Sequence, residues 1–175
     1  MGQVLSTSIE LLSGAFARIR GVVHSALKDA DIEVLTFRAD AEANTIAWLV
    51  WHLTRVQDDH IAALAGQEQV WTAGGWVTRF DLPFGPEETG YGQNAVDAAT
   101  VHADATLLAG YYDAVHARTI DYLHTLTDTD FTRIVDKTWD PPVTLAVRLV
   151  SILSDDLQHA GQASYLRGLA MRAGL

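Results

Sequence analysis

Apolar residues recur at helical spacing in four long segments of the chain. The segments span about residues 4–26, 41–64, 101–126 and 144–169. In each segment apolar side chains return every three or four residues, which is the repeat of one face of an α-helix. The pattern predicts four long helices. The fourth is apolar on nearly all sides, so we expect it to lie at the centre of the fold.

The stretch from Gly66 to about Ala95 has no such repeat. It combines glycines and prolines with large aromatic residues, namely Trp71, Trp76, Phe80, Phe84 and Tyr91. Loops of this length in compact domains are often functional, so these side chains are candidates for a pocket wall or a lid. A packed loop whose aromatic residues only cover the end of the helices fits the same pattern.

The connection between the third and fourth helices is shorter. Asp128–Phe131 predicts a helical turn, and residues 134–139 predict a brief extended piece that Asp140-Pro141-Pro142 ends. Four long helices joined in this way predict an all-α fold, a four-helix bundle with a long aromatic and glycine-rich loop between helices 2 and 3. We expect one domain over residues 1–175.

Composition narrows the classes of function. The formal net charge is −10 at pH 7, which argues against binding to nucleic acid, because a phosphate backbone needs a basic face. The chain has no cysteine, so disulfides, thiolate ligands and cysteine nucleophiles are excluded. No segment has about 18 uninterrupted apolar residues, so we expect no membrane insertion and a soluble, cytoplasmic protein.

Candidate chemistry lies in the fourth predicted helix. Asp155 and His159 are four residues apart, so they lie one turn from each other on one helix face. Two such side chains can be ligands of one metal ion if a third arrives from another helix. His52, within an apolar run of the second helix, is the best candidate. A buried hydrogen bond between aspartate and histidine without metal is the alternative.

The sequence resembles the DinB-like superfamily at these positions. The resemblance rests on His52-Leu53 in the second helix and on the run from Asp155 through His159 to Gly161-Gln162 in the fourth. It implies helices in the order up-down-down-up and a divalent metal, most often zinc. Many relatives have histidine where this chain has Asp155. A carboxylate there resembles the actinobacterial branch of mycothiol-dependent S-transferases and maleylpyruvate isomerases, and it is an acceptable zinc ligand.

The resemblance implies a metal-dependent thiol S-transferase, an enzyme whose metal-bound mycothiol thiolate attacks small electrophiles. Its partners would be a small-molecule electrophile and a low-molecular-weight thiol, with neither nucleic acid nor membrane, and the protein would be a monomer or homodimer. Two alternatives stay open: a small hydrolase with a metal-activated water, and a non-catalytic bundle that binds a metal or small molecule. Candidate residues of the substrate and thiol pocket are Trp48, Asp59, Trp76, Arg79, Tyr91, Tyr112 and Gln162.

Overall fold

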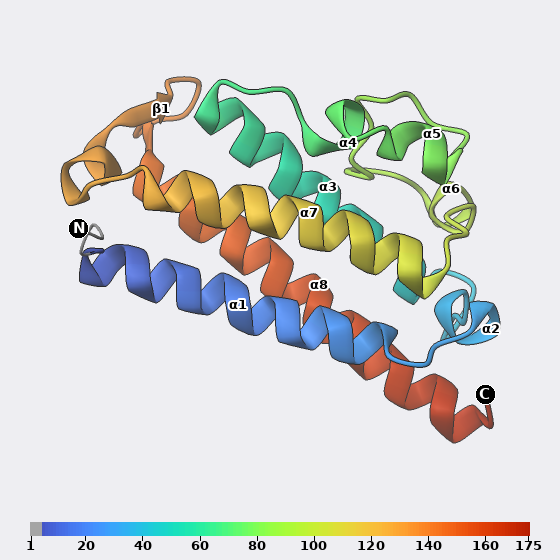
Figure 1. Ribbon diagram of the computed structural model, residues 1–175. Helices are drawn as coiled ribbons and strands as arrows, with labels where there is room; N and C mark the ends of the chain where they lie inside the picture. Colours follow the sequence, from blue (N-terminus) through green and yellow to red (C-terminus); the bar gives the residue numbers. More distant parts are fainter. Residues whose placement is uncertain (1–4) are drawn as a thin grey trace.

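Four long helices form the body of the protein in this computed structural model, which describes residues 5–175. They are α1 (Thr7–Leu27), α3 (Ile46–Ala65), α7 (Ala105–His124) and α8 (Leu145–Ala173). Helices α1 and α8 run in one direction and α3 and α7 in the other, so the order is up-down-down-up (Figure 1). Both α1 and α3 pack against α7 and α8. The predicted all-α bundle is confirmed.

Each long helix begins at a side-chain cap. The capping residues accept a hydrogen bond from the main-chain N–H three residues later, and they are Ser6, Thr45, Asp104 and Thr144. Such a cap satisfies one of the unpaired donors at a helix start. The second helix therefore starts later than the predicted Ala41, and the fourth continues to Ala173, where Gly174 adopts φ +94°. The predicted start of the first helix, Val4, lies outside the described residues.

The stretch between α3 and α7 is more regular than its sequence suggests. It contains α4 (Val70–Ala73) and α5 (Trp76–Phe80), followed by α6 (Ala95–Ala98). A further short helix, α2 (Ile32–Leu35), connects α1 to α3. Helices of four or five residues are too short to show an apolar repeat, and contacts with the bundle stabilise them. The expectation of an irregular stretch was wrong at these positions.

A small hairpin precedes α8. The 3₁₀ turn η1 (Asp128–Thr132) leads to β1 (Ile134–Asp136), which pairs antiparallel with β2 (Val143–Thr144). Ile134 is opposite Thr144, and Asp136 is opposite Val143. The helical turn and the extended piece agree with the sequence pattern. The hairpin lies at the end of the bundle where α3 ends and α8 begins (Figure 1).

The most buried helix is α3, not α8. Every residue from 45 to 55 is buried, including the tryptophans at 48 and 51. By contrast, α8 exposes apolar side chains along its outer face, with Val150 at 60% and Leu157 at 59% exposure. The expectation of a central fourth helix was wrong, because an apolar surface residue and a core residue look alike in sequence.

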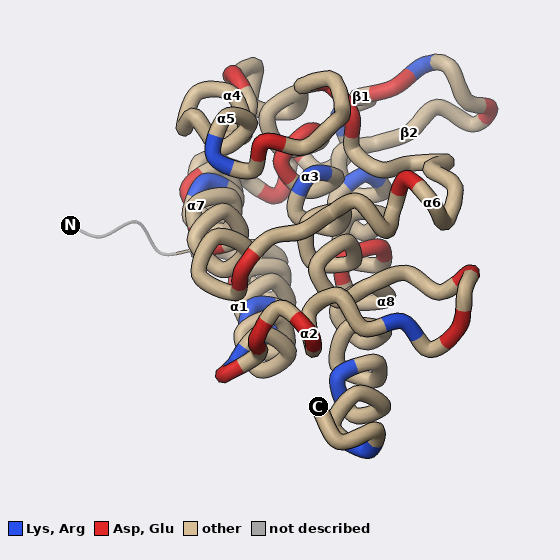
Figure 2. Tube along the Cα trace, turned by 90° about the vertical axis from the view of Figure 1, so that its right-hand side faces the viewer, with Lys and Arg blue, Asp and Glu red and all other residues tan. Residues whose placement is uncertain are grey.

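Charged residues lie mainly on the loops and outer faces of the helices, as expected for groups that are costly to bury (Figure 2). Three charged side chains in the described chain are nonetheless buried: Arg55, Asp58 and Asp156. No helix of residues 5–175 is long and apolar enough to cross a membrane.

Candidate metal centre

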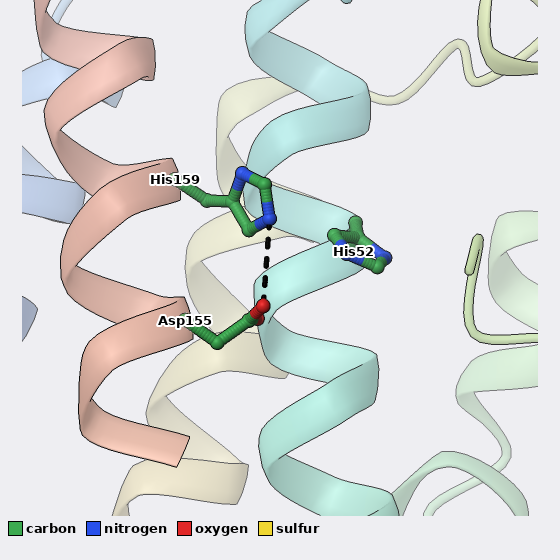
Figure 3. Close-up of side chains that lie close together, drawn as sticks. All are labelled: His52, Asp155 and His159. Carbon is green, nitrogen blue, oxygen red and sulfur yellow. Dashed lines mark ion pairs between the residues drawn. The ribbon is translucent and has the colours of Figure 1, made fainter. Parts of the chain in front are cut away.

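Three side chains from two helices converge on one point between α3 and α8. His52 comes from α3, and Asp155 and His159 come from α8 (Figure 3). One ligand atom of each lies within 4.8 Å of the others. Nε2 of His159 is 3.6 Å from Oδ1 of Asp155, and the two imidazole rings are 4.9 Å apart between centroids, inclined at 74°. The structure thus brings together the three residues that the sequence put forward as metal ligands.

The main chain of the long loop orients His52. Nδ1 of His52 lies 2.6 Å from the carbonyl oxygen of Thr89. A carbonyl oxygen only accepts hydrogen bonds, so Nδ1 donates and Nε2 keeps its lone pair for a metal. Burial lowers the pKa of His52, against the opposing effect of the Thr89 carbonyl. The ring is therefore neutral at pH 7, the state that metal binding requires.

His159 is oriented by a side chain of its own helix. Its Nδ1 lies 2.7 Å from Oε1 of Gln162, so the ring donates through Nδ1 and directs Nε2 toward Asp155. Hydrogen bonds of this kind to the second ring nitrogen fix the tautomer of metal-binding histidines. Gln162, predicted as a pocket residue, therefore supports a candidate ligand.

Trp48 packs against the same pair of rings. Its indole stacks on His52 with centroids 4.5 Å apart and meets the edge of His159 at 6.2 Å. The indole Nε1 donates to Oε1 of Gln93, which holds the ring in place. Trp48 thus forms an apolar wall that limits rotation of His52 and access of water to one side of the centre.

The donor set fits a divalent metal. Oδ2 of Asp155 is buried and has no hydrogen-bond partner among the described residues, so a cation would satisfy an otherwise unpaired oxygen. Two neutral imidazoles and a carboxylate are a usual set for zinc, whose tetrahedral ligands lie about 3.4 Å from one another. The separation of 3.6 Å between His159 and Asp155 is close to that value.

Two of the three candidate ligands, His52 and Asp155, line a cavity of about 370 Å³. Asp59 and Tyr91, two of the predicted pocket residues, line it as well. The side chain of Tyr91 is 90% exposed, which places it at the mouth. The cavity is large enough for a small organic molecule next to the candidate centre.

The other five predicted pocket residues do not line this cavity. Trp48 and Gln162 contact the two histidines instead, and the remaining three lie elsewhere. Trp76 packs against Tyr111 of α7 with centroids 5.5 Å apart, and the guanidinium of Arg79 lies 3.8 Å from the Trp76 ring. These two side chains cover α7, because the short helix α5 docks there. Tyr112 is fully buried within the bundle. Its pKa is raised by burial and then by the nearby Asp156, so it belongs to the interior.

A buried ion pair that sequence reasoning missed holds the loop in place. Arg55 of α3 donates to the carbonyl oxygens of Glu88 at 3.0 Å and Pro86 at 3.0 Å. Asp58 accepts from the main-chain N–H groups at 70 and 71, at 2.8 and 2.7 Å, and lies 3.8 Å from Arg55. The only signal in the sequence was a pair of charges inside an apolar helix. The ion pair fixes the segment that carries the Thr89 carbonyl.

Gly90 lies where the loop passes closest to His52. Its φ is +91°, and a Cβ there would lie 2.9 Å from Nδ1 of His52 and 2.9 Å from the ring of Trp51. Only glycine adopts this conformation without strain and leaves room for the imidazole. The loop can therefore approach His52 closely enough for the Thr89 hydrogen bond.

Comparison with known proteins agrees with this geometry. The family model described as the DinB superfamily matches residues 15–163, which include all three candidate ligands. The chain belongs to the DinB superfamily. Membership confirms the resemblance at the level of the superfamily.

A solved structure supports the same assignment. The crystal structure of a conserved protein from Enterococcus faecalis is 30% identical to this DinB-superfamily protein, with a TM-score of 0.88. The match covers 97% of this chain and 99% of the other. Among curated proteins, none matches the chain.

Proposed function

We propose that this DinB-superfamily protein is a metal-dependent S-transferase that joins a small thiol to an electrophile. The observation that carries the proposal is the convergence of His52, Asp155 and His159 beside a cavity of about 370 Å³. Three protein ligands leave one position of a tetrahedral zinc ion open, as in catalytic zinc sites. Mycothiol is the thiol implied by the branch in which a carboxylate stands at the position of Asp155.

The residues of the chain have distinct tasks in this proposal. His52, Asp155 and His159 would hold the metal, most simply zinc, and a zinc ion there would lower the pKa of a coordinated thiol from its free value of about 8.5. Asp155 would contribute one negative charge to the ligand set and so offset part of the charge of a divalent ion. Thr89 and Gln162 hold Nδ1 of the two imidazoles, which would leave both Nε2 atoms free for a metal.

His60 would accept the proton that the thiol loses. It lines the same cavity as His52 and Asp155. Burial, followed by the charge of Arg148, lowers the pKa of His60, so its ring is neutral at pH 7 and able to accept a proton. The sulfur then forms a bond to the electrophilic carbon. In a displacement the leaving group departs from that carbon with its bonding electrons, and in an addition the neighbouring atom of the former multiple bond receives the electron pair and takes up the proton.

Metal analysis of the purified protein tests the centre. We expect about one divalent ion per chain in wild type and a loss of at least tenfold in metal affinity in His52→Ala and His159→Ala. His124→Ala removes an exposed histidine of α7 and is the matched control, with unchanged metal content. Equal metal content in the wild type and all three variants would show that His52 and His159 are not metal ligands.

Turnover distinguishes the reaction classes. The metal-loaded protein is incubated with 1-chloro-2,4-dinitrobenzene and with mycothiol, another small thiol, or no thiol. The proposal expects conjugation that depends on both thiol and metal. Metal-dependent turnover of an ester that ignores thiol would indicate a hydrolase with an activated water instead. Bound metal without any turnover over a wide panel of electrophiles would indicate a binding protein.

A further inference from the structure

A second cavity, of about 490 Å³, lies at the hairpin end of the bundle. Its wall is built by three elements that are distant in sequence: the end of α3, the beginning of α8, and β1 with the residue before it. His60 lines this cavity and also the cavity beside the candidate metal centre, so the two spaces share a wall.

The cavity is basic within an acidic protein. Arg133 and Arg148 line it with one carboxylate, Asp136, so the charged groups sum to +1 in a chain whose formal net charge is −10. A positive concavity of this kind concentrates anions.

The guanidinium groups of Arg133 and Arg148 are held in place and keep N–H donors that are not used within residues 5–175. Arg148 donates to Oδ2 of Asp136 at 2.8 Å, and Arg133 donates to the hydroxyl of Tyr122 at 3.2 Å. These are their only side-chain hydrogen bonds to residues of the described chain. Each guanidinium has five N–H donors, so most remain available to a ligand.

The register of α8 relates this cavity to the candidate metal centre. Arg148 and Asp155 are seven residues apart, so they lie on nearly the same helix face, roughly 10 Å from each other along the axis. His159 continues the same face one turn further. A ligand that binds Arg148 at one end therefore has its other end at the metal ligands.

We propose that the Arg133–Arg148 cavity is an anion subsite, which binds a carboxylate or phosphate carried by a substrate whose reacting atom lies roughly 10 Å away at the metal centre. The substrate class is then an anionic electrophile or thiol. This proposal rests on the proposed function for its reacting end, but the anion subsite itself needs no metal. Guanidinium groups suit it, because their planar fork binds carboxylate and phosphate through two donors.

Binding of simple anions tests the subsite apart from the chemistry. Succinate and inorganic phosphate are titrated into the ¹⁵N-labelled protein at constant ionic strength, with succinamide as the neutral control. We expect saturable shifts of the Arg133 and Arg148 Nε–H signals with at least one anion and none with succinamide. The stronger of the two anions identifies the group that the substrate carries.

Variants make the test specific. Arg148→Gln and Arg133→Gln should each weaken anion binding at least tenfold, whereas Arg18→Gln removes an equal charge from an exposed position of α1 and should leave it unchanged. Asp136→Asn removes the competing carboxylate and should tighten binding several-fold, a gain that misfolding cannot imitate.

The results separate this proposal from the metal centre. His52→Ala should lose metal and keep anion binding. Absence of saturable binding in wild type, or equal binding in the Arg148→Gln and Arg18→Gln proteins, would overturn the subsite. Anion binding by a wild-type protein that takes up no metal would uphold the subsite and reject the proposed function.

Discussion

The carbonyl oxygen of Thr89 lies 2.6 Å from Nδ1 of His52, and this hydrogen bond joins the loop after α3 to the candidate metal centre. It fixes the tautomer of the imidazole and presents Nε2 to Asp155 and His159. The bond depends on two other features of the chain. Gly90 has no side chain that would push the loop away from His52, and Arg55 holds the loop through a hydrogen bond to the carbonyl oxygen of Glu88. Each of these leads to a prediction.

Gly90→Ala should weaken metal binding. The new Cβ would lie 2.9 Å from Nδ1 of His52, so either the loop or the imidazole must move. Its positive φ adds strain of about 1–3 kcal/mol to folding. Gly92→Ala is the matched control, because Gly92 also has a positive φ but has no atom within 4 Å of an added Cβ. Both variants should lose stability in denaturant titrations, and only Gly90→Ala should lose metal affinity. Equal metal affinities would contradict the role assigned to the Thr89 carbonyl.

Gln162→Leu should reduce metal affinity about tenfold. Loss of a hydrogen bond that orients a metal ligand usually costs about 10- to 100-fold in affinity, and we expect the lower value because Gln162 is exposed. Without Oε1 the ring of His159 is free to rotate. Gln158→Leu is the control, since Gln158 is also exposed on α8 and bonds only to Ser154. Competition with a chromophoric chelator measures both affinities. If the two variants bind metal equally, His159 is held by something other than Gln162.

Arg55→Met should destabilise the protein by about 3–5 kcal/mol, the usual effect of removing one partner of a buried ion pair. Arg55 is fully buried and Asp58 nearly so, and Asp58 would keep an uncompensated charge. Arg79→Met, at an exposed arginine that stacks on Trp76, should change stability by less than about 1 kcal/mol. Urea denaturation gives both values.

The same variant should also release the loop. Hydrogen exchange of the amides from residue 87 to residue 90 should become faster in Arg55→Met while α7 stays protected. Unchanged exchange in that segment would show that Arg55 stabilises only α3 and has no part in placing the Thr89 carbonyl.

Asp156→Asn should stabilise the protein near neutral pH. Asp156 is fully buried, and neither carboxylate oxygen has a partner in the described chain. Burial, and then the charge of Asp155, raises the pKa of Asp156 well above its usual value. The carboxyl is then protonated in the folded state, whereas the unfolded chain releases the proton above pH 4 or so.

The pH dependence follows from the sign of that shift. As pH rises from the ordinary pKa of aspartate toward the raised folded pKa, the wild type loses about 1.4 kcal/mol of stability per pH unit relative to Asp156→Asn. The two proteins should converge near pH 4. Asp121→Asn, at an exposed position of α7, should track the wild type throughout. Denaturation at several pH values measures the gap, and a gap that does not grow with pH would show that Asp156 is ionised in the folded protein.

Local pattern was enough to predict the long helices. Their apolar repeats set α1, α3, α7 and α8 to within a few residues, because helix formation and side-chain burial depend on spacing along one segment. Spacing also put Asp155 and His159 on one face. It could not rank the burial of α8 against that of α3, since burial depends on which neighbours arrive.

The candidate metal centre could not be predicted from the pattern of any single helix. His52 was a candidate because it lies in an apolar run of the second helix, and the family resemblance supported it. Spacing could not show that it meets α8, because 103 residues separate it from Asp155 along the chain. The aromatic residues of the loop looked equivalent in sequence, yet Tyr91 lies at the cavity and Trp76 lies on α7. Docking of α5 on α7 makes that difference.

By itself, then, the sequence determined the helices, the bundle class and the two candidate ligands that share a helical turn, all of which follow from short-range periodicity. Only the tertiary structure decided that Thr89 and Gln162 orient the histidines, that Arg55 and Gly90 position the loop, and that Arg133 meets Arg148 in a basic cavity. These contacts join residues distant in sequence, and packing of the whole chain selects them.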